Sequence, residues 1–376
     1  MMAMVAWETE REPGPCTGRV ARLREHYFTF RPAICVERAL AYTRSYRETE
    51  GLSTGLRRAT ALKRVCADKS VTILADELIV GMPAYQPRGA VICPEISWRW
   101  LEAELDTIAT REQDPYDVTE ERKRALREEV FPYWAGRSME EYYLANLPAG
   151  TRRIAVDTGV IDIELKSQNG PGEFSPGYGN ILLKKGFGGI AASALARSAQ
   201  LDAADPDDYD GLRFLESVVV VCEAADVLAQ RYAEEAERLA AYAAGGGAGP
   251  AGGAPPVSVE RAAELREIAA VCRKVGSEPP ATFREALQLI WFAQVMLLLE
   301  ENGPSYSPGR MDHYLEPFYR ADLEAGRLTR DEALELLECL WVKMAGMTWI
   351  LNENATRYFA GYMPFQDRRA SCRERV

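Results

Sequence analysis

The fold is decided by residues 279–344, PPATFREALQLIWFAQVMLLLEENGPSYSPGRMDHYLEPFYRADLEAGRLTRDEALELLECLWVKM. The first helix of this stretch begins at Thr282, because a Thr followed three residues later by Glu285 has the spacing of a capping box. The same spacing recurs from Thr329, so a second helix begins there. The first helix becomes apolar on all sides at MLLL, residues 296–299, a pattern that an exposed helix could not tolerate. This pattern predicts a helix that runs through the core of a large domain.

Helices also dominate the sequence on the N-terminal side of this stretch. A further capping box begins a helix at Ser138, and a long helix begins near Asp208. The long helix contains a VVVV run, residues 218–221, which we expect to be buried. Next comes AAGGGAGPAGGAPP, residues 243–256, whose composition is that of a flexible insertion. A helix over residues 258–274 follows, and with the long helix it is expected to form a helical hairpin.

Strands are the minority, and the candidates for them are short. Runs rich in β-branched and other apolar residues predict extended segments at residues 71–80, 152–164 and 358–365. An amphipathic helix is expected over residues 31–50, where Pro32 suits a first helical turn. A further helix is expected over residues 181–198, after a glycine-rich loop. The sequence therefore predicts a helix-rich α/β fold.

Length and charge narrow the class of protein. The chain has 376 residues, enough for about two domains or one large domain. Its formal net charge of −11 disfavours nucleic acids and anionic membranes as main partners, because neither offers countercharge. No run reaches the ~18 apolar residues of a membrane helix, and no signal peptide is recognisable. We therefore expect a cytoplasmic protein whose partner is a small molecule.

The cysteines do not suggest a metal site. The eight of them are scattered without a Cys-x-x-Cys pair, and there are only two histidines, so no metal site is expected. Cys93 lies two residues from Glu95, an arrangement that nucleophilic or radical thiol chemistry could use. The alternative is a small apolar cysteine beside a surface glutamate. We favour this alternative because no neighbour in the sequence would supply a base or a cation to activate the thiol.

Two turn-rich loops are better candidates for a binding site. The first, KSQNGPGEFSPGYGNILLKKGFGG, covers residues 166–189 and could present Glu173, Ser175 and Tyr178 to a small polar molecule. An ordinary surface loop is the equal alternative. The second loop, residues 301–319, leaves the most apolar helix of the chain and must either bond internally or line a cavity. Its polar candidates are Asn302, Ser305, Ser307, Arg310, Asp312 and His313. For Arg310 and Asp312 a structural salt bridge is the favoured interpretation.

Taken together, these segments resemble the pyruvate formate-lyase family of glycyl radical enzymes. Besides residues 279–344, the resemblance rests on four segments in the family's order, over roughly residues 15–366. They are RPAICVERALAYTRSYRETEG, DELIVG, PEISWRWLEAELDTIATREQDPY and FAGYMPFQ. Several independent motifs make the resemblance specific. The branch that it resembles most contains glycerol dehydratase and choline trimethylamine-lyase-like enzymes.

The resemblance implies a fold and a chemistry. The expected fold is the first half of a ten-stranded α/β barrel wrapped by helices, which is a homodimer when complete. A radical activating enzyme that uses S-adenosylmethionine would install the glycyl radical of the complete enzyme, in anaerobic metabolism. The implied reaction is radical elimination, by a lyase or dehydratase, on a small polar substrate such as a diol or amino alcohol. The alternatives are an acyltransferase like pyruvate formate-lyase, an arylacetate decarboxylase, or a helix-rich binding module without catalysis.

The sequence departs from the family pattern at its reactive residues. The family's Gly-Cys-x-Glu and Arg-Val-x-Gly-Tyr motifs, which carry the active cysteine and the radical glycine, do not occur in the 376 residues. Residues 367–376, DRRASCRERV, read as a foreign or frameshifted basic tail. The expectation is therefore an N-terminal half without catalytic residues of its own, inactive in isolation.

Part of the substrate pocket is nevertheless expected to remain. By resemblance, Glu173 stands where glycerol dehydratase-like members have a histidine. Asn302-Gly303-Pro304-Ser305 resembles the family's Asn-Gly-His-Ser, with Pro304 in place of the histidine. The expected substrate-binding residues are therefore Glu173, Asn302 and Ser305. Replacing both imidazoles weakens an assignment to glycerol and leaves amines and cationic groups open as ligands.

Overall fold

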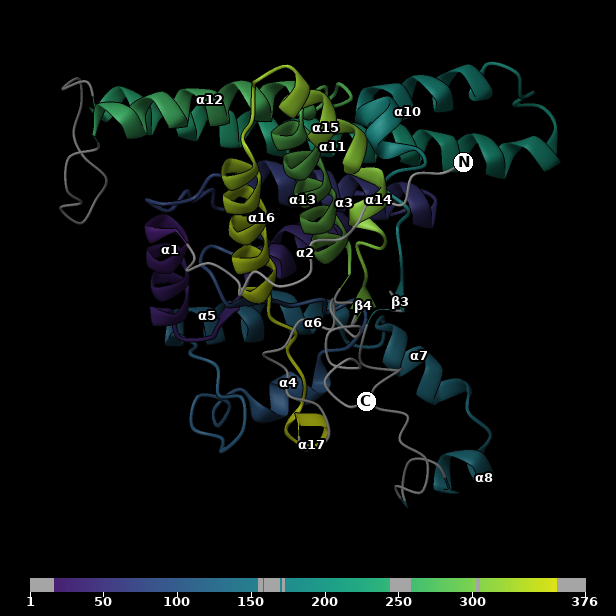
Figure 1. The fold of residues 1–376 in the computed structure, drawn as a ribbon. Helices are drawn as coiled ribbons and strands as arrows, with labels where there is room; N and C mark the ends of the chain where they lie inside the picture. The colour runs from purple at the N-terminus through teal and green to yellow at the C-terminus, as the bar shows by residue number, and fades with distance from the viewer. Residues whose placement is uncertain are drawn as a thin grey trace, which may run out of the picture.

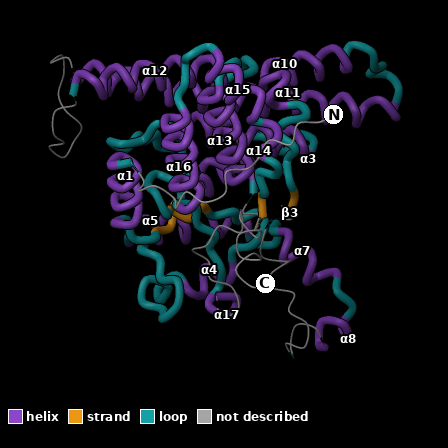
Figure 2. Tube along the Cα trace, in the orientation of Figure 1, coloured by secondary structure: helices purple, strands orange, loops and turns teal. Residues whose placement is uncertain are grey.

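Helices make up most of the chain in the computed structural model, and its strands are short (Figure 1, Figure 2). The structure describes residues 17–154, 158, 170, 173–243, 258–301 and 305–356, with the backbone alone at Glu173, Phe174, Ala243 and Ser305. The N-terminal helices are α1 Gly18–Thr29, α2 Glu37–Glu48, α3 Thr54–Asp68, α4 Arg99–Glu104, α5 Glu120–Ala125, the π-helical turn Leu126–Val130, α6 Phe131–Trp134, α7 Met139–Asn146 and α8 Ala149–Arg152. The later helices are α10 Leu182–Ser198, α11 Pro206–Ala243, α12 Val259–Val275, α13 Phe283–Glu300, α14 Met311–Tyr314, α15 Glu316–Glu324, α16 Arg330–Ala345 and α17 Glu353–Thr356. The strands are β1 Ala33–Cys35, β2 Gly89–Val91, β3 Glu173–Phe174 and β4 Ser305–Tyr306.

The predicted core helix is confirmed as α13. Its capping box is complete: the Thr282 hydroxyl accepts from the Glu285 amide, and the Glu285 carboxylate accepts from the Thr282 amide. Nearly every residue from Phe283 to Met296 is buried, and α3, α10, α11, α12 and α16 all contact α13. The capping boxes predicted at Ser138 and Thr329 are also present, at the starts of α7 and α16. These helix starts depend on local hydrogen bonds, which is why sequence spacing located them.

The predicted hairpin of long helices is confirmed, but the burial of its valine run is not. α11 and α12 pack closely along their lengths, and Ser258 caps α12 as the sequence predicts. Val218 and Val221 pack against the core while remaining partly exposed, and Val219 and Val220 are half-exposed. Four successive helical residues point in all directions around the axis, so all four can be buried only where neighbours enclose the helix. In the described chain each of the four valines therefore stays partly exposed.

The prediction of a strand at residues 71–80 is wrong, because this segment is irregular in the structure. Side chains of α13 satisfy its backbone instead of a neighbouring strand. The Gln288 amide accepts from the Val80 N–H at 2.9 Å and donates to the Val80 carbonyl at 2.7 Å, and the Trp291 indole donates to the Gly81 carbonyl at 2.9 Å. A buried segment needs partners for its polar backbone, but side chains can supply them as well as a ladder can.

Two more predictions of local structure differ from what the structure shows. The helix expected over 31–50 begins only at Glu37, because Ala33–Cys35 form β1. Of the candidate strand 152–164, the structure describes residues 152–154 and 158, and Arg152 ends a helix. The candidate strand 358–365, the insertion 243–256 except Ala243, and the tail 367–376 lie outside the described residues.

Both pairs of strands are parallel. β1 pairs with β2 in the register Ala33↔Gly89, Ile34↔Ala90 and Cys35↔Val91. On its other side β1 bonds to Asp117, whose carbonyl accepts from the Ile34 N–H at 2.9 Å. All of β1 and β2 is buried, as expected for parallel strands covered by helices on their faces. Among the described helices, none has the length and apolar character needed to cross a membrane.

A fully buried charged triad joins three distant segments. The Lys343 ammonium of α16 forms an ion pair with Glu77 and donates to the Tyr27 hydroxyl of α1 at 3.0 Å. Tyr27 in turn donates to the Glu77 carboxylate at 2.6 Å. Burial lowers the pKa of Lys343, and the Glu77 charge opposes this shift. The triad therefore locks α1 and α16 onto the irregular segment that contains Glu77.

Candidate functional site

The two loops singled out in the sequence lie side by side. β3 and β4 pair in parallel with the register Glu173↔Ser305 and Phe174↔Tyr306 (Figure 1). Parallel pairing brings the two segments' carboxyl ends to the same edge. The structure describes only the backbone of Glu173 and Ser305, and Asn302 lies outside the described residues. The juxtaposition of the two loops is thus established, whereas the binding roles of these three residues stay predictions.

The core helix holds the two loops together. The Tyr178 hydroxyl of the glycine-rich loop donates to the Gln294 amide oxygen of α13 at 2.5 Å, and the Gln294 amide nitrogen donates to the Tyr306 carbonyl of β4 at 3.1 Å. Tyr178 is only 3% exposed. Its predicted role as a free hydroxyl for a ligand is therefore wrong, because the hydroxyl is already used to position the loop.

Glu301 is a site residue that the sequence analysis missed. It directly follows α13, is buried, and accepts from the Tyr306 hydroxyl at 2.9 Å. Gly170 approaches it so closely that a Cβ there would lie 2.8 Å from a Glu301 carboxylate oxygen. Burial raises the pKa of Glu301, and the hydrogen bond from Tyr306 opposes the shift. The sequence did contain an indication of this role. Glu300 and Glu301 are two acids at the C-terminal end of a helix, where the helix dipole disfavours negative charge, so a functional or structural partner is needed to explain them.

A buried arginine organises the backbone at the same helix end. Arg38 of α2 forms an ion pair with Glu95, with nitrogen–oxygen distances of 3.1 and 2.5 Å. Its guanidinium also donates to the carbonyls of Leu299 at 2.6 Å and Glu300 at 2.7 Å. Carbonyls at a helix C-terminus have no partner within the helix, and a cation is favourable there. Arg38 therefore fixes the end of α13, from which the second loop departs.

The surroundings of Cys93 differ from those expected. Glu95 is not a surface residue but the buried partner of Arg38, so a cation does lie near the thiol. Burial nevertheless raises the pKa of Cys93; the Arg38 charge lowers it by less, and Glu95 raises it further. The thiol is therefore kept protonated, and the interpretation of Cys93 as a packed, unreactive cysteine is supported for a different physical reason.

A cavity lies directly beyond the carboxyl ends of β3 and β4. This loop cavity has a volume of about 550 Å³ and is lined by residues of both loops: Ser175, Gly177, Gly179, Asn180, Leu183, Lys184, Pro308, Gly309, Arg310, His313, Tyr314, Pro317 and Phe318. Glycines let the loops touch, because a Cβ on Gly179 would lie 2.6 Å from the Tyr314 Cβ, and one on Gly309 would lie 2.8 Å from the Ser175 hydroxyl. Ser175, Arg310 and His313, three of the predicted polar candidates, are thereby brought together.

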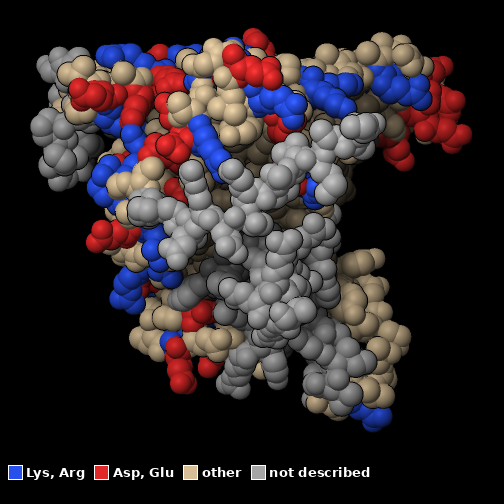
Figure 3. All heavy atoms as spheres, viewed as in Figure 1, with Lys and Arg blue, Asp and Glu red and all other residues tan. Residues whose placement is uncertain are grey.

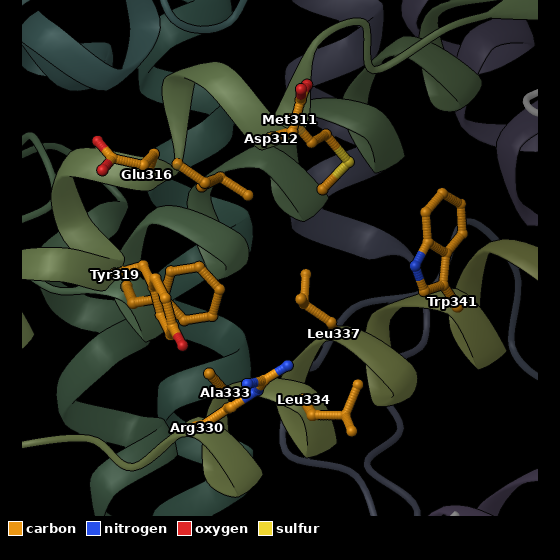
Figure 4. Close-up of a pocket in the computed structure, with 11 residues that line it drawn as sticks. Met311, Asp312, Glu316, Tyr319, Arg330, Ala333, Leu334, Leu337 and Trp341 are labelled. Atoms are coloured by element: carbon orange, nitrogen blue, oxygen red, sulfur yellow. The ribbon is translucent and has the colours of Figure 1, made fainter. Parts of the chain in front are cut away.

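A second hollow is apolar and differs in character. It is a groove of about 430 Å³ between α14, α15 and α16, with Met311 and Leu337 between Tyr319 and Trp341 (Figure 4). Asp312 lies at its rim and forms an ion pair with Arg310 at 2.7 Å, in which both side chains are 66% exposed. The structural salt bridge favoured for this pair is therefore confirmed. Its lining is mainly apolar, with polar groups at Asp312, Glu316, Tyr319 and Arg330.

The described residues do not assemble the reactive groups of radical chemistry. In those parts of the chain no three His, Cys, Asp or Glu side chains lie close enough to hold a metal ion. All six cysteines in those parts are free and buried. The glycine and cysteine motifs of radical chemistry are also absent from the 376 residues.

The comparisons with known proteins agree with one another. A family model described as pyruvate formate lyase-like matches residues 6–369. Isethionate sulfite-lyase from Nitratidesulfovibrio vulgaris is 36% identical over 335 residues, which cover 87% of this chain and 39% of that protein. Trans-4-hydroxy-L-proline dehydratase from Clostridioides difficile is 32% identical, over 86% of this chain and 39% of that protein. The chain thus spans 39% of the length of these two relatives.

A solved structure confirms the fold class. The glycerol-bound form of the B12-independent glycerol dehydratase from Clostridium butyricum matches with a TM-score of 0.85 and 35% sequence identity. The match covers 93% of this chain and 42% of that one. The predicted helix-rich α/β fold, as part of a glycyl radical enzyme barrel, is therefore confirmed.

Proposed function

The chain belongs to the pyruvate formate lyase-like family, and from this premise we propose that it forms the N-terminal part of a glycyl radical lyase or dehydratase. In this proposal it contributes one wall of a pocket for a small polar substrate such as a diol or amino alcohol. Similar proteins named as a sulfite-lyase, a hydroxyproline dehydratase and a glycerol dehydratase support this reaction class.

The parallel pairing of β3 with β4 carries the proposal. It sets Glu173 and Ser305, from loops far apart in the sequence, at one register position. A carboxylate and a hydroxyl at that position suit a ligand that donates hydrogen bonds, such as an alcohol or an ammonium group. Gln294 holds both loops from the core, so the wall is preorganised before a ligand arrives.

The radical chemistry would come from parts of the complete enzyme other than these 376 residues. A glycyl radical, installed by an activating enzyme that uses S-adenosylmethionine, would start the reaction by hydrogen abstraction in a complete enzyme. This chain has neither the glycine nor the cysteine motif for that step. We therefore assign it binding and positioning of the substrate, with the activating enzyme and a second copy in a homodimer as partners of the complete enzyme.

Electron paramagnetic resonance tests the assignment of roles. The chain is incubated anaerobically with a radical activating enzyme, S-adenosylmethionine and reductant, beside trans-4-hydroxy-L-proline dehydratase with its own activating enzyme as the positive control. We expect a glycyl doublet from the control and none from this chain. A doublet on this chain would overturn the assignment.

A binding experiment tests the pocket wall. Saturation-transfer nuclear magnetic resonance would compare ethanolamine with glycerol on the wild-type chain, on Glu173→Gln and on Glu128→Gln, whose carboxylate is exposed. We expect Glu173→Gln to weaken ethanolamine selectively, because the anionic partner of the ammonium is lost, and Glu128→Gln to change nothing. Equal binding by all three proteins would reject the role of Glu173.

A binding module without catalysis is the second candidate function, and the cavity between the two loops is the observation that favours it. Co-expression with the C-terminal portion of glycerol dehydratase separates the two functions. If the chain forms part of an enzyme, we expect the portions to copurify and this chain to protect its partner from proteolysis. A binding module would remain a separate, folded protein.

A further inference from the structure

We propose that the loop cavity is a second binding site, which takes a small monocarboxylate with an apolar body and holds it by the ammonium group of Lys184. The cavity lies beyond the carboxyl ends of β3 and β4, and the described residues of its lining begin at Ser175 in the first loop and at Pro308 in the second. The inference goes beyond the proposed function, because an anionic ligand held by Lys184 differs in charge from the alcohol or ammonium ligand proposed for Glu173 and Ser305.

The walls of the cavity are rigidly built. One wall is the glycine-rich loop up to the first turn of α10, and the other runs from β4 to α15. The close contact of Gly179 with Tyr314 sets the spacing of the walls, and the Tyr314 hydroxyl donates to the Pro308 carbonyl at 2.7 Å. The volume of about 550 Å³ lies in the range of small-molecule pockets, roughly 300–1,000 Å³.

The charge of the cavity is opposite to that of the whole chain. Its described lining residues include Lys184, Arg310 and His313, and none of those described is an aspartate or glutamate, although the chain carries a formal net charge of −11. Arg310 is already neutralised by Asp312. Within the described ranges, no ion pair involves the Lys184 ammonium or the His313 imidazole. Among the described lining residues, an anion entering the cavity would therefore meet the Lys184 ammonium and the His313 imidazole, neither of which is held in an ion pair with another described residue.

The remaining lining residues indicate the chemical character of the rest of the ligand. Leu183, Pro308, Pro317 and Phe318 offer an apolar surface, whose burial against a ligand is favourable. A single unpaired ammonium balances a single negative charge, so a monocarboxylate fits better than a polyphosphate, which needs several cations or a metal ion. An aromatic or aliphatic monocarboxylate combines both requirements.

A titration with three ligands of one skeleton tests this inference. Phenylacetate, 2-phenylethanol and phenethylamine share an aromatic body and carry an anionic, a neutral and a cationic head. Nuclear magnetic resonance titration of the whole chain would give the three affinities. We expect phenylacetate to bind about fivefold or more tightly than the alcohol, and the amine to bind more weakly than either. Equal affinities, or tighter binding of the amine, would overturn the inference.

Three variants at two neighbouring lysines locate the binding site. Lys184→Gln should weaken phenylacetate about fivefold, and Lys184→Arg should retain most of the affinity. Lys185→Gln is the matched control, because Lys185 is the next residue of α10, lies outside the cavity lining and donates to the Ser193 hydroxyl at 2.8 Å. Both lysines are exposed, so neither change should affect folding. Loss of affinity in the control as well would place the anion elsewhere.

The test is independent of the proposed function. Glu173→Gln, which is expected to weaken ethanolamine, should leave phenylacetate binding unchanged, and Lys184→Gln should leave ethanolamine unchanged. If Glu173→Gln weakened phenylacetate, the two ligands would share one site and the second site would be rejected.

Discussion

Replacing Lys343 by methionine should destabilise the chain strongly. Lys343 is the buried counter-ion of Glu77, and the two side chains are 1% and 0% exposed. Methionine nearly matches the volume of the lysine stem, so the change removes charge without creating a large cavity. The Glu77 carboxylate would keep the hydrogen bonds from the Tyr27 hydroxyl at 2.6 Å and the Leu74 amide at 3.0 Å, but no cation would face it.

The expected size of the effect follows from burial. Breaking a buried ion pair by removing one partner costs about 3–5 kcal/mol. The two remaining donors to Glu77 place Lys343→Met at the lower end, near about 3 kcal/mol. In the double variant Glu77→Gln/Lys343→Met no charge is left uncompensated, so its stability should lie within about 1 kcal/mol of the wild type. The coupling between the two positions, rather than either single value, is the signature of the pair.

Urea unfolding followed by tryptophan fluorescence measures this cycle. Trp291 is a local probe, because the Lys343 ammonium lies 5.7 Å from the centre of its ring. With a denaturant slope of about 3 kcal/mol/M, the single variant should unfold about 1 M earlier. Lys63→Met is the control, since the Lys63–Glu223 pair is exposed and should contribute at most about 1 kcal/mol. A small effect of Lys343→Met, or a double variant as unstable as the sum of the singles, would refute the reasoning.

Three further predictions concern single residues. Burial lowers the pKa of Lys69 to about 8, below its ordinary value of ~10.4. Between these two pH values the unfolded chain binds more protons than the folded chain. The free energy of unfolding therefore increases with pH over this range, by about 3 kcal/mol in total. Lys69→Met should abolish this rise between about pH 8 and 10 in urea unfolding, and an unchanged rise would contradict the assignment. Thr282→Ala should cost about 1 kcal/mol by loss of the cap on α13, whereas Thr282→Ser should not. Gly179→Ala should separate the two loops, because its methyl group would lie 2.6 Å from the Tyr314 Cβ. Amide hydrogen exchange in both loops should then become faster. An unchanged exchange rate would show that the close contact is not needed to hold the loops together.

Local chemistry explains what could be predicted from the sequence. The starts of α7, α13 and α16 depend on a hydroxyl and a carboxylate three residues apart, and the start of α12 on a single serine cap. The pair of Arg310 and Asp312 is equally local. The two candidate loops were recognisable by their glycines and polar residues, and their resemblance to family segments correctly placed them in a glycyl radical enzyme fold.

Contacts between distant segments explain what could not be predicted. Residues 71–80 have the composition of a strand, yet Gln288 and Trp291 satisfy the backbone around Val80 and Gly81, so no strand is needed. Glu95 had the pattern of a surface residue until Arg38 supplied its charge partner. In each case the group that decides the structure lies far away in the sequence, so the local pattern of polar and apolar residues cannot predict it.

The sequence by itself determined the helix-rich class, the family and the two loops, because these depend on local hydrogen bonding, periodicity and motif order. Only the tertiary structure decided that the loops pair through β3 and β4 and that Tyr178 is a structural group. It also showed that Lys184 and His313 line a cavity in which none of the described lining residues is an acid. The physical reason is that a site is defined by which charges and hydroxyls remain unpaired after folding. That balance exists only when every segment has found its partners.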